Sequence, residues 1–466
     1  MEKEKIRPPI VCVLGHVDHG KTTLLDSIRK TNVVAQEKGG ITQSIGASVI
    51  TTKEGKKITF IDTPGHAAFS KMRSRGAKVA DIIVLVVAAD DGVKPQTKEA
   101  IQLIKEESTS FVVAITKVDL PTASVEEVKG QLAKEGVMLE GRGGDIPVIA
   151  VSAKQGKGID ELLETISLLS EIQGVSASLD SPLEAVVIES YKDKKGPLAT
   201  IVIRNGGLSI GDEIQAGEVN GKVKAIFDDK GVPQKKITAG YPALILGLEE
   251  VPSVGSLVTI KNSAPKLALK KKQERWIGKL KEGEIPIILK ARNAGVIEAI
   301  KENLPSKIVV VDFSVGDVTE SDVLAAKASN SLIFAFESRV SSQVAKLAQA
   351  EGVVIERFDI IYELIQRLEE ILKKGTLQIQ GKAEIIASFP FEDKKVAGCR
   401  VIEGKISKND NLILMRGEKE LGRVKAVSLK KQKQTISEAT TGEEFGILFM
   451  PQLDFQIKDM LVSVRK

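Results

Sequence analysis

The chain has 466 residues, of which 42% are hydrophobic, and its formal net charge is +5. This length allows several domains of roughly 150 residues each, and the hydrophobic content excludes a chain that is disordered by composition. Aromatic residues make up only 4% of the chain, which argues against a base-stacking surface as its main function. The two cysteines, Cys12 and Cys399, exclude a disulfide framework and a cysteine zinc site.

The first residues and the hydropathy pattern bear on the compartment. Met1 to Lys5 are charged and lack the apolar core of a signal peptide. No run approaches the roughly 20 apolar residues that a membrane-spanning helix needs. The low cysteine number suits a reducing compartment. We therefore expect a cytoplasmic protein without a membrane partner.

Residues 1–172 alternate short apolar, β-rich runs with helix-like stretches. This alternation predicts a mostly parallel sheet with helices on both faces, and ligands of such sheets bind at the carboxyl ends of the strands. The expected strands are Ile10–Leu14, Ile58–Ile61, Ile82–Ala88, Phe111–Ile115 and Val148–Val151.

A glycine-rich loop follows the first expected strand. Gly15 to Thr22 have the spacing G-x-x-x-x-G-K-[ST] and precede a helix-like stretch. Glycines let backbone N–H groups turn toward a phosphate, Lys21 can reach the outer phosphates, and the Thr22 hydroxyl can ligate Mg²⁺. Taken alone, the motif also fits an ordinary turn. We expect phosphate contacts from Gly15, His16, Val17, Asp18, His19, Gly20, Lys21, Thr22, Thr23 and Gly65.

A second motif, Asp62-Thr63-Pro64-Gly65-His66, follows the next expected strand. An acid at this point is placed to hold Mg²⁺, and the Gly65 amide can contact a terminal phosphate. His66 is a candidate for positioning the attacking water, whereas we expect the side chains of His16 and His19 to support the loop. Thr42 offers a hydroxyl for the same metal, although an ordinary loop threonine fits equally well. The metal candidates are Thr22, Thr42 and Asp62.

The last two expected strands are each followed by a motif that suits a guanine base. A carboxylate at Asp119 can accept hydrogen bonds from both N1–H and N2–H₂ of guanine, a pair of donors that adenine lacks. The Lys117 stem can cover the base, and a backbone N–H near Ala153 can meet the guanine oxygen. The guanine candidates are Thr116, Lys117, Asp119, Ser152, Ala153 and Lys154. Four motifs in this order, each after an apolar strand, predict a GTP site.

These motifs resemble those of the translational GTPases. The stretches Gly39-Gly40-Ile41-Thr42-Gln43 and His66-Ala67-Ala68-Phe69 narrow the resemblance to bacterial translation initiation factor two. The resemblance implies that GTP, GDP and Mg²⁺ are the ligands. It also implies that His66 is the catalytic histidine, which the ribosome moves into place. This chain departs from the family in having Thr116 in place of asparagine and Ser44 in place of histidine.

After a small, polar stretch at Glu171–Asp180, expected to be a linker, residues 181–266 consist of short β-rich runs with glycine turns. They predict a β-barrel similar to the second domain of translational GTPases. Contact with the ribosome follows only from the resemblance, and a spacer is the alternative. Lys266–Leu280 is compatible with a helix. Its lysines Lys270–Lys272 suit either RNA contact or a solvated helix face.

Residues 283–359 predict a small α/β/α domain without a phosphate loop, and Thr319-Glu320-Ser321-Asp322 matches a stretch of the family. Residues 360–375 show apolar residues at helical spacing, which predicts a long connecting helix that ends at Gly375. A lever between domains and a plain packed helix are both open for it.

Residues 377–466 predict a C-terminal β-barrel. Ala199–Ser209 align without a gap over Ala397–Ser407, which indicates two barrels of one type. The stretch from Arg423 to Lys433 carries five basic residues and no acidic one, so it suits either phosphate contact or a solvated strand edge.

The resemblance implies that this last barrel binds the aminoacyl end of formylmethionyl initiator tRNA. The candidate contacts are Cys399, Lys431, Glu444 and Gly446. Two departures from the family affect this region: Lys431 replaces arginine, and Phe445 replaces cysteine. Phe445 also fits a barrel core.

The chain is therefore predicted to be a multidomain α/β and β protein of the translation initiation factor two family. The resemblance implies a monomer that works with both ribosomal subunits, formylmethionyl initiator tRNA and other initiation factors. Many family members carry a long N-terminal extension, whereas about nine residues precede the first expected strand here, so we expect either a natural short form or a trimmed chain. Two alternatives remain: an elongation-type tRNA carrier, which the third domain argues against, and a GTP-gated RNA-binding scaffold.

Overall fold

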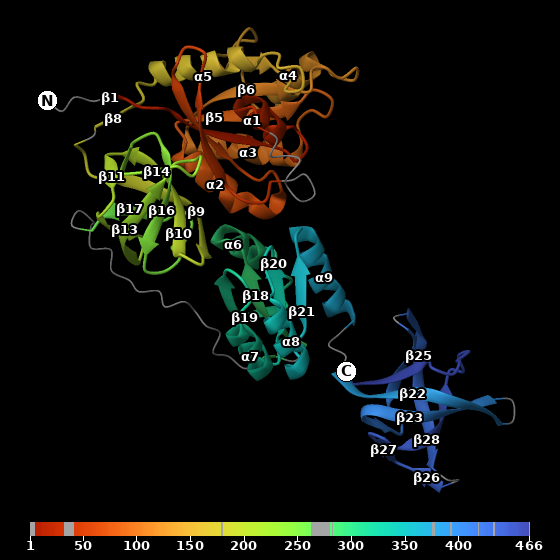
Figure 1. Cartoon of the computed structure of the whole chain (residues 1–466). Helices are drawn as coiled ribbons and strands as arrows, with labels where there is room; N and C mark the ends of the chain where they lie inside the picture. Colours follow the sequence, from red (N-terminus) through yellow and green to blue (C-terminus); the bar gives the residue numbers. More distant parts are fainter. Residues whose placement is uncertain are drawn as a thin grey trace. The chain divides into compact units, whose positions relative to one another are not determined.

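The computed structural model describes residues 5–31, 42–178, 180–261, 280–281, 283–374, 378–391, 394–417, 419–431 and 434–465. The chain divides into two compact units, one up to Gln366 and one that begins with Arg367 and also takes in Lys281–Ile285. Each unit is described by itself (Figure 1). Across these described residues, no helix has the length and apolar character to cross a membrane.

The amino-terminal domain is built on a six-stranded sheet with the order β3-β4-β2-β5-β6-β7. Strands β4, β2, β5, β6 and β7 run parallel, as the alternating sequence pattern predicts, and β3 is antiparallel to β4. The strands are β2 Ile10–Gly15, β3 Gly46–Thr51, β4 Lys57–Asp62, β5 Ile82–Ala88, β6 Ser110–Thr116 and β7 Val148–Ala150.

Helices cover both faces of this sheet (Figure 1). Alternate residues of the buried strands point to opposite faces, so each face has its own hydrophobic core. Val11 and Val13 pack with α1 and α5, whereas Cys12 and Leu14 pack with α2, α3 and α4. The helices are α1 Lys21–Arg29, α2 Ser70–Val79, α3 Pro95–Glu107, α4 Val125–Lys134 and α5 Ile159–Ile172, and the 3₁₀ turn η2 Ala67–Phe69 precedes α2.

The prediction of a linker at Glu171–Asp180, after this domain, is partly wrong. Helix α5 extends to Ile172, and β8 (Ser176–Ala177) pairs with β1 (Lys5–Ile6) instead of remaining an open connection. Strand β3 was also not expected, because its residues are only partly buried and lack a continuous apolar run. Strand β8 depends on pairing with β1 from the far end of the domain, which a local pattern does not record. Strand β3 forms a hairpin with the neighbouring β4.

The next domain is a β-barrel of six strands. The order β12-β17-β9-β10-β16-β13 is closed by pairing of β12 with β13. Its core consists of inward-facing aliphatic residues such as Val187, Ile201 and Ile245. The strands are β9 Glu184–Asp193, β10 Gly196–Asn205, β11 Gly207–Ser209, β12 Glu213–Ala216, β13 Val219–Phe227, β14 Pro233–Gln234, β15 Lys236–Thr238, β16 Pro242–Leu248 and β17 Leu257–Ile260.

A smaller α/β domain follows, with the strand order β19-β18-β20-β21. Helices α7 and α8 pack on one face through Val323, Ala326, Val344 and Ala348. The elements are β18 Ile285–Ala291, α6 Ala294–Glu302, β19 Ile308–Val315, α7 Glu320–Ser329, β20 Leu332–Phe336, α8 Ser342–Glu351, β21 Ile355–Phe358 and the connecting helix α9 Ile361–Lys374. The Thr319–Asp322 stretch forms the capping box that begins α7.

Several expectations fall outside the described residues. They are the glycine loop before Thr42, most of Lys266–Leu280 with its lysines and Trp276, the helix stop at Gly375, and Lys433.

The second unit is another closed six-stranded barrel, in which the order β22-β29-β24-β25-β28-β23 is closed by pairing of β22 with β23. Its core includes Cys399, Phe445 and Phe449. The strands are β22 Gln378–Phe391, β23 Lys394–Ser407, β24 Asn411–Arg416, β25 Lys419–Lys431, β26 Gln434–Ile436, β27 Glu438–Thr440, β28 Glu444–Met450 and β29 Met460–Arg465.

The two barrels share local geometry at the positions of the sequence repeat. The Ser209 N–H donates to Asp212 Oδ2 at 2.8 Å, and the Ser407 N–H donates to Asp410 Oδ2 at 2.7 Å. These aspartates aligned in the sequence, so the repeat reflects one recurring turn as well as one barrel type.

Substitution of Gly404 is a test of the backbone geometry in the second barrel. Its φ is +69°, and a Cβ there would lie 2.2 Å from the Gln380 carbonyl oxygen. Gly417 in the same barrel has φ +61° but no atom near its missing Cβ. We expect Gly404→Ala to lower the free energy of unfolding of this barrel by about 2 kcal/mol or more, and Gly417→Ala by about 1 kcal/mol.

The measurement is denaturant-dependent hydrogen exchange of the β23 and β25 amides in the full chain. Equal losses for the two variants would contradict the steric explanation and leave only the cost of the left-handed backbone.

Candidate functional site

One cavity of about 300 Å³ brings most of the predicted nucleotide residues together. It lies at the carboxyl ends of the parallel strands, where open α/β sheets bind their ligands. Gly15, His16, His19, Asp62 and Ser152 are the predicted nucleotide or metal residues that do not line it. Its lining residues are Val17, Asp18, Gly20, Lys21, Thr22, Thr23, Thr42, Gly65, His66, Thr116, Lys117, Asp119, Leu120, Ala153 and Lys154.

The glycine-rich loop wraps around the start of α1. Gly20 caps this helix with φ +85°, and Asp18 also has a positive φ of 59°. The first N–H groups of α1 therefore have no helical partner and face the loop, which suits an anion. Lys21 is 6% exposed and donates to the His16 carbonyl at 2.5 Å. Burial lowers the pKa of Lys21 to about 8, a cost that a neighbouring phosphate would offset.

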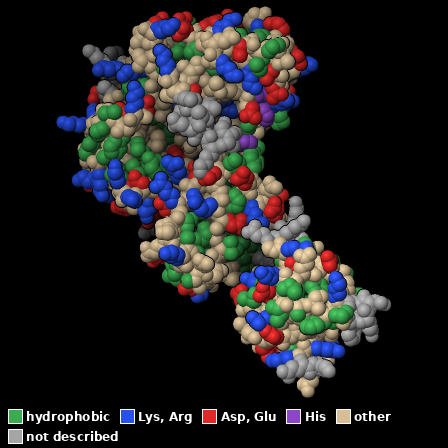
Figure 2. Space-filling view, turned by 45° about the vertical axis from the view of Figure 1, so that its right-hand side comes forward, with side chains coloured by type: hydrophobic (Ala, Val, Ile, Leu, Met, Phe, Trp, Pro, Cys, Tyr) green, Lys and Arg blue, Asp and Glu red, His purple; other side chains and the backbone are tan. Residues whose placement is uncertain are grey.

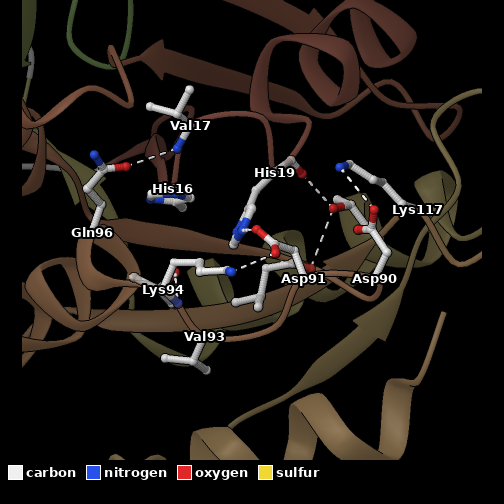
Figure 3. Close-up of polar contacts among 12 residues, drawn as sticks. His16, Val17, His19, Asp90, Asp91, Val93, Lys94, Gln96 and Lys117 are labelled. Carbon is white, nitrogen blue, oxygen red and sulfur yellow. Dashed lines mark hydrogen bonds and ion pairs between the residues drawn. The ribbon is translucent and has the colours of Figure 1, made fainter. Parts of the chain in front are cut away.

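Side-chain hydrogen bonds hold the glycine-rich loop in place (Figure 3). Gln96, in the first turn of α3, accepts a hydrogen bond from the Val17 N–H at 3.0 Å. The buried His19 ring lies 3.4 Å from Asp91, and burial lowers its pKa to about 4. The Thr116 hydroxyl donates to the His19 carbonyl at 2.6 Å. His19 thus supports the loop as a neutral ring, and Thr116 ties the loop to β6.

Three oxygen-bearing side chains could hold a divalent cation. The hydroxyls of Thr22 and Thr42 are 2.9 Å apart. Asp62, at the end of β4, is 4% exposed, and its Oδ1 atom has no hydrogen-bond partner. Burial raises the pKa of Asp62 to about 6, so the ionised carboxylate needs a cation nearby. This set of hard oxygen donors, completed by phosphate oxygens, fits Mg²⁺.

The turn after Asp62 lies against the phosphate loop. A Cβ at Gly65 would be 2.3 Å from Lys21 Nζ and 3.2 Å from the Val17 amide nitrogen, so a larger residue would displace the lysine. His66 follows at the start of η2, and burial lowers its pKa, with Lys21 and Arg73 acting in the same direction. His66 is therefore a neutral imidazole at pH 7.

A buried arginine holds this turn in place. Arg73 is completely buried, and its Nη1 donates to the carbonyls of Pro64 and His66. Its Nη2 donates to both carboxylate oxygens of Glu99, at 2.8 and 2.9 Å. Since Glu99 and Gln96 both belong to α3, this one helix positions the His66 turn and the phosphate loop together.

The predicted guanine residues meet at the ends of β6 and β7. The Ser152 hydroxyl donates to Asp119 Oδ1 at 2.7 Å and lowers the pKa of that carboxyl. Asp119 is thus ionised and held in one orientation, as a hydrogen-bond acceptor for a base edge requires. Lys117 has a positive φ of 57°, and its Nζ lies 3.4 Å from Asp90.

The candidate tRNA residues of the C-terminal barrel separate into buried and exposed ones. Cys399 is completely buried in the core, because it alternates along β23 with the outward-facing Arg400. Burial also raises the pKa of its thiol. Because the thiol lies inside the barrel, the expectation from the sequence that Cys399 contacts a ligand directly is wrong for this structure. Phe445 is also buried in the core, as its alternative interpretation had it.

The exposed candidates lie within ion pairs. The Lys431 Nζ donates to Glu443 at 2.6 Å and lowers the pKa of Glu443 to about 2. Glu444 accepts a hydrogen bond from Arg400 Nε at 3.0 Å. Basic and acidic side chains lie next to one another on this barrel (Figure 2). Gly446 pairs with Gly398 and with Lys430 on the neighbouring strands.

Sequence reasoning missed Arg73, Glu99 and Gln96. Arg73 stands among other basic residues of α2, a pattern typical of a solvated helix face. Only its helical register, one turn after the buried Phe69, distinguishes it from its exposed neighbours. No sequence motif distinguished Glu99 or Gln96 from other polar residues of a helix.

Comparison with known proteins agrees with this geometry. Residues 7–171 match the model of the elongation factor Tu GTP-binding domain, residues 182–260 that of elongation factor G domain 2, and residues 262–369 that of translation-initiation factor 2. Translation initiation factor IF-2 of Caldanaerobacter subterraneus is 43% identical over 96% of this chain and 68% of its own length. That of Dehalococcoides mccartyi is 42% identical over 99% of this chain and 82% of its own.

Among solved structures, GDP-bound aIF5B from Aeropyrum pernix aligns over 99% of this chain and 92% of its own, with 28% identity and a TM-score of 0.48.

The parallel sheet, the phosphate loop and the guanine-type motifs define a P-loop GTPase of the translational type, and guanine nucleotides are its ligands. The chain belongs to the translation initiation factor IF-2 family and is a translation initiation GTPase. Membership of this family excludes an elongation-type tRNA carrier. The predicted fold class is confirmed: the P-loop domain is followed by a barrel, the small α/β domain and the C-terminal barrel.

The Arg73–Glu99 pair generates a prediction. Glu99→Gln leaves the buried guanidinium without its carboxylate, so we expect the GTPase domain to lose about 1–3 kcal/mol of unfolding free energy. Glu135→Gln, which breaks the exposed pair with Lys98, should cost about 0.5 kcal/mol or less.

Urea unfolding gives the loss of free energy for both variants, and hydrogen exchange of the amides from Gly65 to Phe69 reports on the turn that Arg73 holds. We expect faster exchange at these amides in the Glu99 variant alone. Equal losses for the two variants would mean that burial of Arg73 does not matter.

Proposed function

We propose that this GTPase binds Mg²⁺·GTP and formylmethionyl initiator tRNA, places the tRNA on the small ribosomal subunit, promotes joining of the large subunit and hydrolyses GTP when the ribosome activates it. The observation that carries the proposal is the convergence of the phosphate, hydroxyl and guanine-type groups on one cavity of a chain in the initiation factor family. The cytoplasm is the corresponding compartment, other initiation factors are further partners, and the protein acts as a monomer.

The phosphates would lie in the glycine-rich loop. Backbone N–H groups of Asp18, His19 and Gly20 and of the start of α1, with Thr23, would donate to phosphate oxygens. His16 and Val17 would border the phosphates, with the Val17 N–H bonded to Gln96. Lys21 would exchange its bond with the His16 carbonyl for one with a phosphate. The close approach of Gly65 to Lys21 supports a Gly65 N–H contact with the terminal phosphate.

Thr22, Thr42 and Asp62 would hold Mg²⁺, which neutralises charge on the phosphates when it is bound. The orphaned Oδ1 of buried Asp62 and the proximity of the two hydroxyls support this assignment. The protein's contribution is to keep the Asp62 carboxylate buried and the two hydroxyls on the same side of the loop.

Asp119 would accept hydrogen bonds from the guanine N1–H and N2–H₂, with Lys117 over the base and the Ala153–Lys154 backbone at the guanine oxygen. The bond from Ser152 supports this role, because it keeps Asp119 ionised and oriented. Thr116 acts on the base indirectly: its hydroxyl is bonded to the phosphate loop.

The C-terminal barrel would bind the aminoacyl end of the tRNA. Lys431, Glu444 and Gly446 provide exposed charge and backbone on neighbouring strands, while Cys399 and Phe445 support that surface from the core. Because Lys431 and Arg400 are already paired with acids, tRNA phosphates must compete with Glu443 and Glu444 for them.

His66 would position the attacking water next to the terminal phosphate. We expect His66→Ala to keep its affinity for GTP and to lose about 100-fold or more of ribosome-stimulated turnover, the range for general acid–base groups. Single-turnover hydrolysis with ribosomes and fluorescent nucleotide binding measure the two quantities separately.

His16→Ala is the comparison, since His16 is an imidazole of the neighbouring glycine-rich loop and its side chain is assigned only a supporting role. Unchanged ribosome-stimulated turnover in the His66 variant would contradict the assignment.

A further inference from the structure

Two side chains that flank the nucleotide cavity contact one short segment at the start of α9. Gln43, next to Thr42, is 6% exposed and donates to the Asp359 carbonyl at 2.7 Å. The Ile361 N–H donates in return to Gln43 Oε1 at 3.2 Å. One residue further on, the Tyr362 hydroxyl is hydrogen-bonded to His66 Nδ1. The segment Asp359–Tyr362 thus contacts both Gln43 and His66, and His66 lines the cavity.

The Tyr362 and His66 rings are in direct contact. Their centroids are 4.4 Å apart, and the ring planes meet at 64°, an edge-to-face arrangement. Burial raises the pKa of Tyr362 and lowers that of His66, so at neutral pH the phenol is protonated and the imidazole is neutral. Either group could donate in a bond between a neutral phenol and a neutral imidazole. Because a phenol is the more acidic donor and an imidazole nitrogen the more basic acceptor, the favoured direction is from the Tyr362 hydroxyl to Nδ1 of His66.

This direction of the bond fixes the tautomer of His66. A neutral imidazole carries one proton and has one nitrogen lone pair in the ring plane. With the Nδ1 lone pair occupied by Tyr362, the proton is on Nε2. The ring can then donate a hydrogen bond but cannot accept one.

Positioning of an attacking water requires the opposite property. A water that attacks phosphorus uses an oxygen lone pair and gives up a proton, so the group that orients it must accept a hydrogen bond from it. His66 cannot do this while Tyr362 is bonded to Nδ1.

We propose that Tyr362 is a positioning residue that holds His66 in a non-accepting state until the segment Asp359–Tyr362 withdraws. This inference rests on the role of His66 given under Proposed function. Withdrawal of the segment would release His66 and break two hydrogen bonds of Gln43, which would keep only its longer bond of 3.4 Å to Glu337. The segment leads directly into α9, so displacement of α9 frees the catalytic histidine and loosens the residue next to the candidate metal ligand Thr42 in one step.

The tautomer is the most direct readout, and the chain suits it because it contains only three histidines. In full-length protein labelled with ¹⁵N-histidine, we expect His66 to be protonated at Nε2. Tyr362→Phe keeps the ring contact and removes the hydroxyl, and it should shift His66 to a mixture of tautomers. Tyr241→Phe, at a partly buried tyrosine packed against the core of the first barrel, is the matched control and should change nothing. A His66 tautomer that is the same in wild type and Tyr362→Phe overturns the proposal.

Hydrolysis kinetics provide the second readout. Tyr362→Phe should raise single-turnover GTP hydrolysis without ribosomes by roughly two- to tenfold, the range for one hydrogen bond. The increase should vanish when His66→Ala is added. An unchanged or lower rate in Tyr362→Phe overturns the proposal.

These experiments distinguish a failure of the proposed function of His66 from a failure of the role of Tyr362. If His66→Ala keeps ribosome-stimulated turnover, the proposed function of His66 fails. If His66→Ala loses turnover while Tyr362→Phe leaves the tautomer and the rate unchanged, the role of Tyr362 fails and that of His66 stands.

Discussion

The arrangement of the nucleotide site depends on the buried guanidinium of Arg73. It is the only group described here that joins the carbonyls of Pro64 and His66 to a carboxylate on α3. A buried cation is stable only with its partners in place, so the turn that carries Gly65 and His66 has one favoured position relative to the sheet. Helix α3 also supports the phosphate loop through Gln96. The two loops that would face a terminal phosphate therefore share one rigid support.

Around this support, burial makes the charged forms of Lys21 and Asp62 less favourable than they would be in water. Burial lowers the pKa of Lys21 to about 8 and raises that of Asp62 to about 6, so both charged forms are disfavoured without a ligand. A phosphate and a cation supply the charges that each one lacks. Binding of Mg²⁺·GTP thus relieves two desolvation costs at once, and loss of the terminal phosphate restores part of them.

The sequence predicted the parts of the site that lie directly after a strand. Asp62 ends β4, Asp119 lies in the loop after β6, and Gly20 and Lys21 end the loop that follows β2, so a local pattern and a known chemistry coincide at each of them. It did not predict Arg73 or Tyr362, because their roles depend on contacts with residues distant in the chain. Cys399 shows a related limit: the motif located the right strand, but the alternation of faces along β23 places the thiol inside the barrel.

Binding of formylated and unformylated initiator tRNA to the full chain with GTP is the measurement that tests the proposed function most directly. We expect the formylated tRNA to bind more tightly by about tenfold or more, a difference of about 1.4 kcal/mol. We also expect Lys431→Glu to weaken binding of the formylated form, because it removes a cation from the proposed surface. Equal affinities for the two tRNAs would contradict the assignment of the C-terminal barrel to initiator tRNA.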